Sequence, residues 1–381
     1  MCFRFISMVR VLLSARQFDR MAGGLEHQAI SILNALAHRG YDCHLMTRDM
    51  LNAETFYPLD KRVRWHRMGF STANRERLAR LRSVRSLLID VQPDIVLGFQ
   101  QGPYLLPRIT SYGLLGATTK KQIRVVACER VSPFQYQFVN QGLTKHKIYA
   151  TYQLADAITV QCPSYVDAYP RTLRHKVKVI PNAVKDATGL SEPTKPNKHA
   201  LQPWTMLHVG RHCDQKSQSL LLQAFANLSK QFPDWHLVFV GDGNDLAKNQ
   251  KISQSLDLQD RVSFEGAKTN VTDYYRKAHV FVFPSKYEGF PNALAEALAH
   301  GLPSVGFAGC AGVSDLISHN INGLAAAGNQ SLETFQEAMA KVMSDTQMRS
   351  RMHRAAIESM KTYEPNTVFD QWDEFLQEVV R

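Results

Sequence analysis

Short apolar runs alternate with amphipathic helical patterns along this chain, and the alternation occurs twice. In the first half, strand-like runs such as VRVLLSA (9–15), YDCHLMT (41–47) and DIVLGF (94–99) are separated by helical segments. The second half repeats the scheme, from TMLHVGR (205–211) to LPSVGFAG (302–309). Such alternation is typical of parallel sheets with helices on both faces. The sequence therefore predicts an α/β protein with two doubly wound, Rossmann-like domains.

A polar segment separates the two halves. Residues 186–203 contain three prolines and almost no apolar periodicity, which indicates an interdomain linker. We therefore expect an N-terminal domain over residues 1–185 and a second domain over residues 204–364. The remaining residues, 365–381, are predicted to form a helix that returns to the N-terminal domain. With 381 residues and 44% hydrophobic content, each domain has ample core.

The positive charge is concentrated in the first half. Residues 1–190 hold 27 Lys and Arg against 13 Asp and Glu, whereas residues 191–381 hold 18 against 21. This asymmetry is consistent either with an anionic partner for the first half or with a role in solubility. No recognised nucleic-acid-binding motif occurs there, and the basic residues are not interleaved with stacking aromatics, so nucleic acid is not expected as a partner.

One predicted helix, over residues 74–90, is strongly basic. Its apolar stripe consists of Leu78, Leu81, Val84 and Leu88, and the arginines around it are Arg75, Arg77, Arg80, Arg82 and Arg85. A helix of this kind suits either peripheral contact with an anionic membrane or ordinary sheet covering with a solvated basic face.

The cysteines and the N-terminus predict a cytoplasmic protein. The six cysteines contain no CxxC pair, so neither a disulfide framework nor a thiolate metal cage is expected. Arg4 and Arg10 interrupt the first apolar run, and no window approaches the roughly 18 apolar residues of a membrane span. Either Met1 or Met8 is compatible with the start of the chain.

Two stretches that suggest cofactors are discounted. His208, His212 and Cys213 invite a zinc interpretation, but His208 lies inside a predicted strand and the set lacks a fourth ligand, so no metal is expected. GDGNDL (241–246) lacks the third glycine and the ribose-binding acid of a dinucleotide fingerprint. A tight turn explains that stretch as well, and no nicotinamide cofactor is expected.

Two other stretches suggest phosphate binding. Gly23 and Gly24 precede a predicted helix, where the backbone can approach a ligand closely and free N–H groups can meet an anion, although a plain turn has the same pattern. Arg211 and Lys216 follow a strand and precede another helix, which is the arrangement of a diphosphate clamp.

The stretch KYEGFPNALAEAL (286–298) contains two acids in an apolar surrounding. Glu288 lies in the predicted loop, and Glu296 shares a helix face with Asn292. Pro291 suits the first helical position, and Gly301 suits the end. No local cation is available to Glu296, so we expect these acids to meet solvent, a distant cation such as Arg211 or Lys216, or the hydroxyl groups of a sugar ligand.

EGFPNALAEALAHGLPSV (288–305) strongly resembles the nucleotide-sugar site of the family 4 retaining glycosyltransferases, whose mark is two glutamates separated by seven residues. GGLEH (23–27), VIPNAV (179–184) and VGRHCDQKS (209–217) are similar to further family motifs, so the resemblance covers nearly the whole chain. It implies the GT-B fold, in which two Rossmann-like domains flank an interdomain cleft. Where the family commonly has Lys-Gly, this chain has Lys216-Ser217.

The resemblance also implies roles for individual residues. Glu288 would lie beside the transferred sugar, Glu296 would bind the ribose, and Arg211 and Lys216 would neutralise the diphosphate without a metal. The further donor-binding residues would be Gly23, Gly24, Gly266, Gly289, Phe290, Pro291 and Asn292. On the acceptor side, Glu129 and Arg130 occupy a position where relatives often carry His or Arg-Asn.

The sequence thus predicts a retaining glycosyltransferase with a nucleotide-sugar donor, UDP-linked rather than GDP-linked. The acceptor is predicted to be a glycan or a lipid-linked saccharide in lipopolysaccharide or exopolysaccharide biosynthesis, at the inner membrane face. Two alternatives remain open at this point. One is a nucleotide-sugar epimerase of the same fold, and the other is a non-enzymatic basic protein that binds anions.

Overall fold

The chain forms two compact units, described here from a computed structural model. Unit 1 comprises residues 1–183 and 366–381, and unit 2 comprises residues 184–365. The structure describes residues 8–21, 23–70, 77–100, 102–111, 122–138, 144–185, 187–197 and 203–381. Part of the predicted linker packs within unit 2, where the Ser191 N–H donates to the His300 carbonyl at 2.9 Å.

Unit 1 is built on a seven-stranded sheet with the order β3-β2-β1-β4-β5-β6-β7. Every neighbouring pair is parallel, as the alternating sequence predicts. The strands are β1 (Arg10–Ser14), β2 (Asp42–Thr47), β3 (Arg64–Arg67), β4 (Ile95–Phe99), β5 (Arg124–Cys128), β6 (Ala157–Val160) and β7 (Val177–Val179). The helices are α1 (Gly24–His38), α2 (Arg77–Val91), α3 (Leu105–Ser111), α4 (Thr144–Tyr152), α5 (Arg171–Arg174) and α13 (Pro365–Val380).

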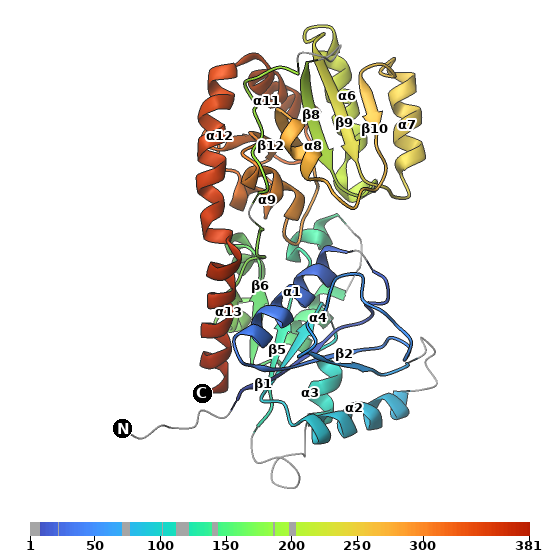
Figure 1. The fold of residues 1–381 in the computed structure, drawn as a ribbon, viewed down its shortest axis with the longest axis vertical. Helices are drawn as coiled ribbons and strands as arrows, with labels where there is room; N and C mark the ends of the chain where they lie inside the picture. The colour runs from blue at the N-terminus through green and yellow to red at the C-terminus, as the bar shows by residue number, and fades with distance from the viewer. Residues whose placement is uncertain are drawn as a thin grey trace. The chain divides into compact units, whose positions relative to one another are not determined.

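The basic helix α2 covers the sheet of unit 1, but only part of its predicted apolar stripe is buried. Val84 and Leu88 are fully buried, whereas Leu78 is 70% exposed. Helix α2 lies beside α3 (Figure 1). Arg75 lies outside the described residues. The C-terminal half of the stripe therefore packs as in an ordinary sheet-covering helix, and Leu78 faces solvent.

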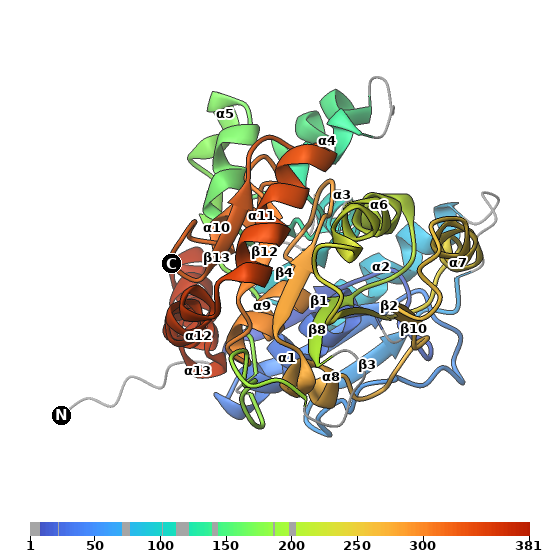
Figure 2. The same ribbon diagram turned by 90° about the horizontal axis from the view of Figure 1, so that it is seen from above.

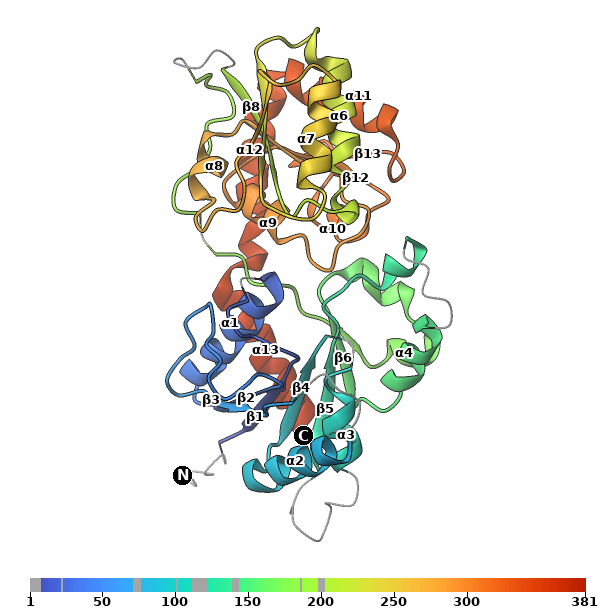
Figure 3. The same ribbon diagram turned by 90° about the vertical axis from the view of Figure 1, so that its right-hand side faces the viewer.

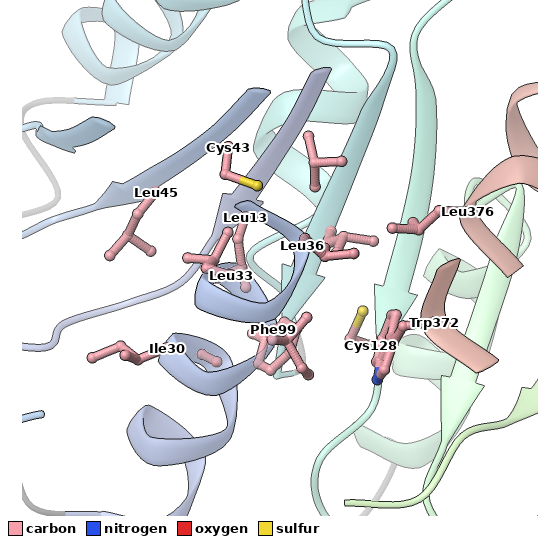
Figure 4. Packing of buried hydrophobic residues seen from close by; sticks show 14 of the residues in the cluster. Leu13, Ile30, Leu33, Leu36, Cys43, Leu45, Phe99, Cys128, Trp372 and Leu376 are labelled. Carbon is pink, nitrogen blue, oxygen red and sulfur yellow. The ribbon is translucent and has the colours of Figure 1, made fainter. Parts of the chain in front are cut away.

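Helix α13 completes the core of unit 1. Trp372 and Leu376 are fully buried in one cluster with Leu36 of α1 and with Phe99 and Cys128 at the ends of β4 and β5. Figure 4 shows Trp372 beside Cys128. Burial of these apolar side chains joins the C-terminal segment to the sheet formed by the first 183 residues.

Unit 2 repeats the architecture with a six-stranded sheet of order β10-β9-β8-β11-β12-β13, again entirely parallel. Its strands are β8 (Trp204–Val209), β9 (Trp235–Val240), β10 (Val262–Phe264), β11 (Val280–Phe283), β12 (Ser304–Phe307) and β13 (Gly323–Ala326). Its helices are α6 (Gln218–Ser229), α7 (Leu246–Ser255), α8 (Thr272–Lys277), α9 (Asn292–Ala299), α10 (Val313–Leu316), α11 (Leu332–Ser344) and α12 (Thr346–Met360).

The helices of unit 2 pack in groups. Helix α6 lies between α7 and α11 (Figures 2 and 3), and α9 lies beside α12 (Figure 1). The fold class predicted from the sequence is confirmed by these two doubly wound sheets. No helix of the described residues is long and apolar enough to cross a membrane.

Candidate active site

The strand order of unit 2 places two loops where a ligand is expected. The chain leaves the centre of the sheet at β8 toward β9 and β10, and then returns to the other side of β8 with β11. Ligands of doubly wound sheets bind at the carboxyl ends of the strands where the order reverses. In unit 2 this point lies between the loop after β8 (residues 210–217) and the loop after β11 (residues 284–291), which contain the predicted clamp and Glu288.

Lys216 and Glu288 form an ion pair between these two loops. The Lys216 ammonium donates to Glu288 Oε1 at 2.6 Å, and the two side chains are only 14% and 6% exposed. The ammonium also lies 4.7 Å from the centre of the Phe283 ring. A pair that is this short and this shielded from water is held in one geometry. The expectation that a cation from elsewhere in the fold meets one of the two acids therefore holds for Glu288.

Further contacts join the same two loops. The Lys286 N–H donates to the Gln215 carbonyl at 2.9 Å, and Gln215 Nε2 donates to the Tyr287 carbonyl at 2.7 Å. The Lys286 ammonium and Asp214 Oδ1 are 2.6 Å apart. These bonds fix the backbone on both sides of the charged pair.

Arg211, the other predicted cation, belongs to the same loop but has a different environment. Its side chain is exposed. Its carbonyl accepts from Gln218 Nε2 at 2.8 Å, which fixes the backbone at the start of the loop. The guanidinium influences Tyr287, whose pKa is raised by burial and lowered in part by the charge of Arg211. Arg211 thus offers a solvent-accessible positive charge near the loop that contains Glu288.

Glu296 projects from helix α9 toward a tyrosine. Tyr275 donates its hydroxyl to Glu296 Oε2 at 3.0 Å and also contacts the Ala293 carbonyl at 3.2 Å. Burial raises the pKa of Glu296, and the hydrogen bond from Tyr275 and the charge of Lys185 oppose this shift. The carboxylate is thus held by one neutral donor and has capacity for further donors, such as sugar hydroxyls.

Helix α9 begins one residue later than the sequence predicts. Asn292 is its first residue, and Pro291 occupies the N-cap position. The Asn292 N–H donates to the Phe290 carbonyl at 2.8 Å, so this N–H is used within the turn. Phe290 is buried and contacts Tyr363, with 5.9 Å between ring centres. Gly289 lies in this loop between Glu288 and Phe290.

At two positions of unit 2 the structure explains why glycine is present. Gly266 follows β10 with φ +68°, and a β-carbon at this position would meet no other atom, so the left-handed conformation itself favours glycine there. Gly243, in GDGNDL, approaches the His212 backbone so closely that any side chain would collide with it. The close turn predicted for GDGNDL accounts for its glycines.

The residues that suggested zinc make other contacts. His208 is fully buried, its Nδ1 lies 2.9 Å from the Val282 carbonyl, and burial lowers its pKa to about 3. His212 Nδ1 lies 3.0 Å from Asn249 Nδ2. The described residues contain no group of three His, Cys, Asp or Glu side chains that could hold a metal ion.

In unit 1, the glycine pair begins helix α1 as predicted. Gly23 is the N-cap, and Gly24 is the first, exposed residue of the helix. A side chain at Gly23 would collide with the carboxylate of Glu26, which is itself buried and whose pKa is raised by that burial. A side chain at position 23 would therefore displace the Glu26 carboxylate from its present position.

The predicted acceptor-side residues Glu129 and Arg130 follow β5 and are held from several sides. The buried Glu129 carboxylate accepts from the Tyr152 hydroxyl and from the N–H groups of Arg130 and Val131. Arg130 Nη1 donates to Asn182 Oδ1 at 3.1 Å, and its guanidinium lies 4.4 Å from the centre of the Phe99 ring. Burial lowers the pKa of Arg130 to about 10.

Unit 1 also has a small cavity at the point where its own strand order reverses, between β1 and β4. The cavity measures about 30 Å³, and its lining includes Ser14, Thr47, Arg48, Phe70 and Gly102. Partial burial and the charges of Arg16 and Arg80 lower the pKa of Arg48. The sequence pattern gave no sign of Arg48, because its neighbours come from separate segments.

Other residues of the site were also missed by the sequence. Tyr275 contacts Glu296 from a helix 21 residues away, and Gln215 and Gln330 tie the two loops together. Gln215 lies within VGRHCDQKS but was not singled out there, and Tyr275 and Gln330 belong to no motif that was recognised. The one available signal for these residues was their position near the ends of the strands.

The doubly wound sheets with charged loops at their strand ends are shared by known proteins. The sequence pattern described as Glycosyl transferases group 1 matches residues 191–359, and that of Glycosyltransferase Family 4 matches residues 22–187. The structure matches GT-B glycosyltransferases. The chain belongs to the family 4 glycosyltransferases and is an enzyme of that class.

Several relatives cover nearly the whole chain. An uncharacterised glycosyltransferase of Haemophilus influenzae is 24% identical over 357 residues, which is 92% of this chain and 95% of the relative. The amylovoran biosynthesis glycosyltransferase AmsD of Erwinia amylovora is 24% identical over 356 residues, 93% of this chain and 96% of AmsD.

Solved structures that share the fold over nearly the whole chain include WaaB and HepE. The apo form of the lipopolysaccharide outer core galactosyltransferase WaaB has a TM-score of 0.75 at 18% identity, and the match covers 97% of this chain and 99% of WaaB. HepE of Anabaena, in complex with UDP and glucose, has a TM-score of 0.74 at 16% identity, covering 97% of this chain and 100% of HepE.

Proposed function

We propose that this enzyme transfers a hexosyl group from a UDP-sugar to a glycan or lipid-linked saccharide acceptor in lipopolysaccharide or exopolysaccharide biosynthesis. Support for the pathway comes from the relatives AmsD and WaaB, whose names refer to amylovoran and to the lipopolysaccharide outer core. Support for the nucleotide comes from HepE, which was solved with UDP and glucose.

The observation that carries the proposal is the Lys216–Glu288 ion pair at the reversal point of the unit 2 sheet. In transfer from a nucleotide sugar, the bond between the anomeric carbon and the phosphate oxygen breaks, and its electron pair stays on the leaving diphosphate. Positive charge that is already in position stabilises this developing negative charge without reorganisation. We assign that role to Lys216 and Arg211, so the neutralising charges come from side chains and not from a metal ion.

The two acids then have separate tasks. Glu288, on the loop that contacts Lys216, lies beside the reacting sugar. Glu296, on the face of α9, accepts hydrogen bonds from the ribose hydroxyls. Gly266 and the loop Gly289–Asn292 complete the donor site in unit 2, and Gly23 and Gly24 contribute the phosphate-binding turn of unit 1. Glu129 and Arg130 are assigned to the acceptor side.

We also propose that the anomeric configuration of the donor is retained, as the family resemblance implies. Proton NMR of the freshly formed product tests this point, because the coupling of the anomeric proton distinguishes the two configurations. An inverted product would contradict the assignment to a retaining enzyme.

Peripheral contact with an anionic membrane is part of the proposal, because a lipid-linked acceptor would lie at a membrane surface. It is supported by the basic first half of the chain and by Leu78, which is exposed at the start of α2. Flotation with vesicles containing anionic lipid tests this contact. Binding that is absent at low salt, or equal for neutral vesicles, would contradict it.

The central experiment screens UDP-sugars and GDP-sugars by thermal shift and then follows nucleotide release with the stabilising donor and a matched acceptor. Lys216→Ala and Glu288→Gln should each lower release by about 100-fold. Variants that are folded and release nucleotide at the wild-type rate would refute the proposed function. Donor that is converted to an epimer without acceptor would identify an epimerase instead.

A further inference from the structure

Gln330 joins the two loops that hold the charged pair. It follows strand β13, and its side-chain amide contacts both loops. Its Oε1 accepts from the Ser217 hydroxyl at 2.6 Å, and its Nε2 donates to the Pro284 carbonyl at 2.8 Å. Ser217 is the residue after Lys216, and Pro284 lies at the start of the loop that leads to Glu288. One amide group thus connects the Ser217 hydroxyl, next to Lys216, with the backbone that leads to Glu288.

Both partners of the Ser217–Gln330 hydrogen bond adopt a conformation that disfavours them. Ser217 has φ +50° and Gln330 has φ +67°, which is the left-handed region where glycine is unstrained. Ser217 also precedes helix α6 as its N-cap, yet its hydroxyl makes no cap hydrogen bond. The hydroxyl is directed to Gln330 instead. Two non-glycine residues therefore adopt the left-handed conformation and share a side-chain bond that glycine could not make.

The neighbouring residue extends the same connection. Asn329 Nδ2 donates to the Lys286 carbonyl at 2.9 Å. Lys286 in turn bonds through its N–H to Gln215, which is the residue before Lys216. The turn after β13 therefore supports both loops from one side, at positions next to the charged residues.

We propose that Gln330 is a positioning residue for transfer, which acts by setting Lys216 against Glu288. This inference rests on the proposed function of the Lys216–Glu288 pair. Gln330 fixes where the ammonium of Lys216 sits when negative charge develops on the leaving diphosphate. Small displacements of preorganised charges lower rates strongly, and about 1 Å is enough to cost roughly 100-fold. We therefore expect the effect of Gln330 to depend on the presence of Lys216.

The test uses Gln330→Gly, because glycine accepts the left-handed conformation. The substitution removes the side-chain bonds to Ser217 and Pro284, together with a 3.3 Å bond from Nε2 to Asn329 Oδ1. The variant should melt near the wild-type temperature and show a kcat for transfer that is lower by about 10-fold or more, with a smaller change in the donor KM. In a Lys216→Ala background, the same substitution should lower single-turnover transfer by less than about 2-fold, since its effect passes through the lysine. If Gln330 had a merely structural role, the fold-losses in transfer rate of the two single variants would multiply in the double variant.

Ser217→Gly gives an independent check from the other side of the bond. It should reproduce part of the loss in kcat, and the double variant with Gln330→Gly should be no worse than Gln330→Gly alone. Gln336→Ala is the matched control, because Gln336 accepts from Asn227 Nδ2 at 2.8 Å in another amide contact of the same unit. This control should retain wild-type kcat.

Amide hydrogen exchange provides a readout that needs no catalysis. The Lys286 N–H, which bonds to Gln215, should exchange faster in Gln330→Gly than in wild type. Unchanged exchange, wild-type kcat, or a full multiplicative loss in the Lys216→Ala background would each overturn the inference. If wild-type protein transfers no sugar from any donor, the proposed function fails, whereas the exchange experiment still decides whether Gln330 holds the loops.

Discussion

Lys216 and Glu288 lie 2.6 Å apart and connect two loops that are 72 residues apart in sequence. Because both side chains are largely buried, each loses part of its hydration, and the opposite charge of its partner offsets that loss. A short, shielded ion pair of this kind contributes to the geometry of unit 2 as well as to its chemistry.

We predict that Lys216 and Glu288 are energetically coupled. Lys216→Met and Glu288→Gln should each lower the free energy of unfolding by about 2 kcal/mol, because each leaves its partner without this contact. The double variant should recover about 1 kcal/mol or more of the summed loss. Denaturant unfolding of the four proteins measures the coupling. The exposed pair Lys195–Glu192, also 2.6 Å long, is the control and should show coupling within about 0.5 kcal/mol.

The two glutamates should differ in their kinetic effects. Glu288→Gln should mainly lower kcat, by about 100-fold, since its carboxylate lies beside the reacting sugar in the proposed site. Glu296→Gln should mainly weaken UDP binding, by about 10-fold, because a charged acceptor of the ribose hydroxyls is lost. Steady-state kinetics and calorimetric titration with UDP measure the two effects. The opposite pattern would reverse the assignment of the acids.

Stability should fall in mild acid because of buried histidines such as His279. The Thr205 N–H donates to Nδ1 of His279 at 2.8 Å, which requires the unprotonated nitrogen. Burial lowers the pKa of His279 from 6.5 to about 4. Between these values the unfolded chain binds a proton that the folded chain does not, so stability decreases as the pH falls from 6.5 toward 4.

The contribution of His279 to this loss should reach about 3 kcal/mol at the acid end of that window. Denaturant unfolding at pH 7.5, 6.5, 5.5 and 4.5 should give a shallower pH dependence for His279→Gln than for wild type. His175→Gln changes an exposed histidine and serves as the control. Equal pH dependence of the His279 variant and wild type would show that this histidine does not titrate in the way described.

Trp372 should be essential for the stability of unit 1. Trp372→Ala removes a fully buried ring from the cluster around Leu36 and Cys128, and we expect a loss of about 3–5 kcal/mol. Hydrogen exchange should increase in β1 and β4 while the sheet of unit 2 keeps its protection. The control, Glu378→Ala, removes only an exposed ion pair with Lys178 and should be nearly neutral. Equal loosening of both units would contradict a local role.

The sheets could be predicted because buried parallel strands are continuous apolar runs, as in DIVLGF and HVFVFPS. Strands β3 and β13 were not predicted. RWHR of β3 is polar and lies at the edge of its sheet, and GLAA of β13 is short and weakly apolar, so neither has a strong strand pattern.

Individual residues of the site could be predicted only where a motif contains them. Glu288, Glu296 and Lys216 lie in stretches that resemble family motifs, and the structure brings Lys216 to Glu288. The contact of Glu296 with Tyr275 and the bond between Ser217 and Gln330 join segments that are 21 and 113 residues apart. Such pairs depend on the register of separate strand ends, which no local pattern encodes. The start of α9 was wrong by one residue because Pro291 suits both the N-cap and the first turn.

Unit 1 is assembled from two separate stretches of the polypeptide, and this affects how the protein is made. During translation, residues 366–381 emerge only after the whole of unit 2 has been synthesised. Until then, the nascent sheet lacks Trp372 and Leu376, and the apolar side chains that α13 covers, such as Leu36 and Cys128, have no permanent cover. Unit 2, by contrast, is one continuous stretch and can fold as soon as it leaves the ribosome. The domain that is synthesised first is therefore the one that is completed last.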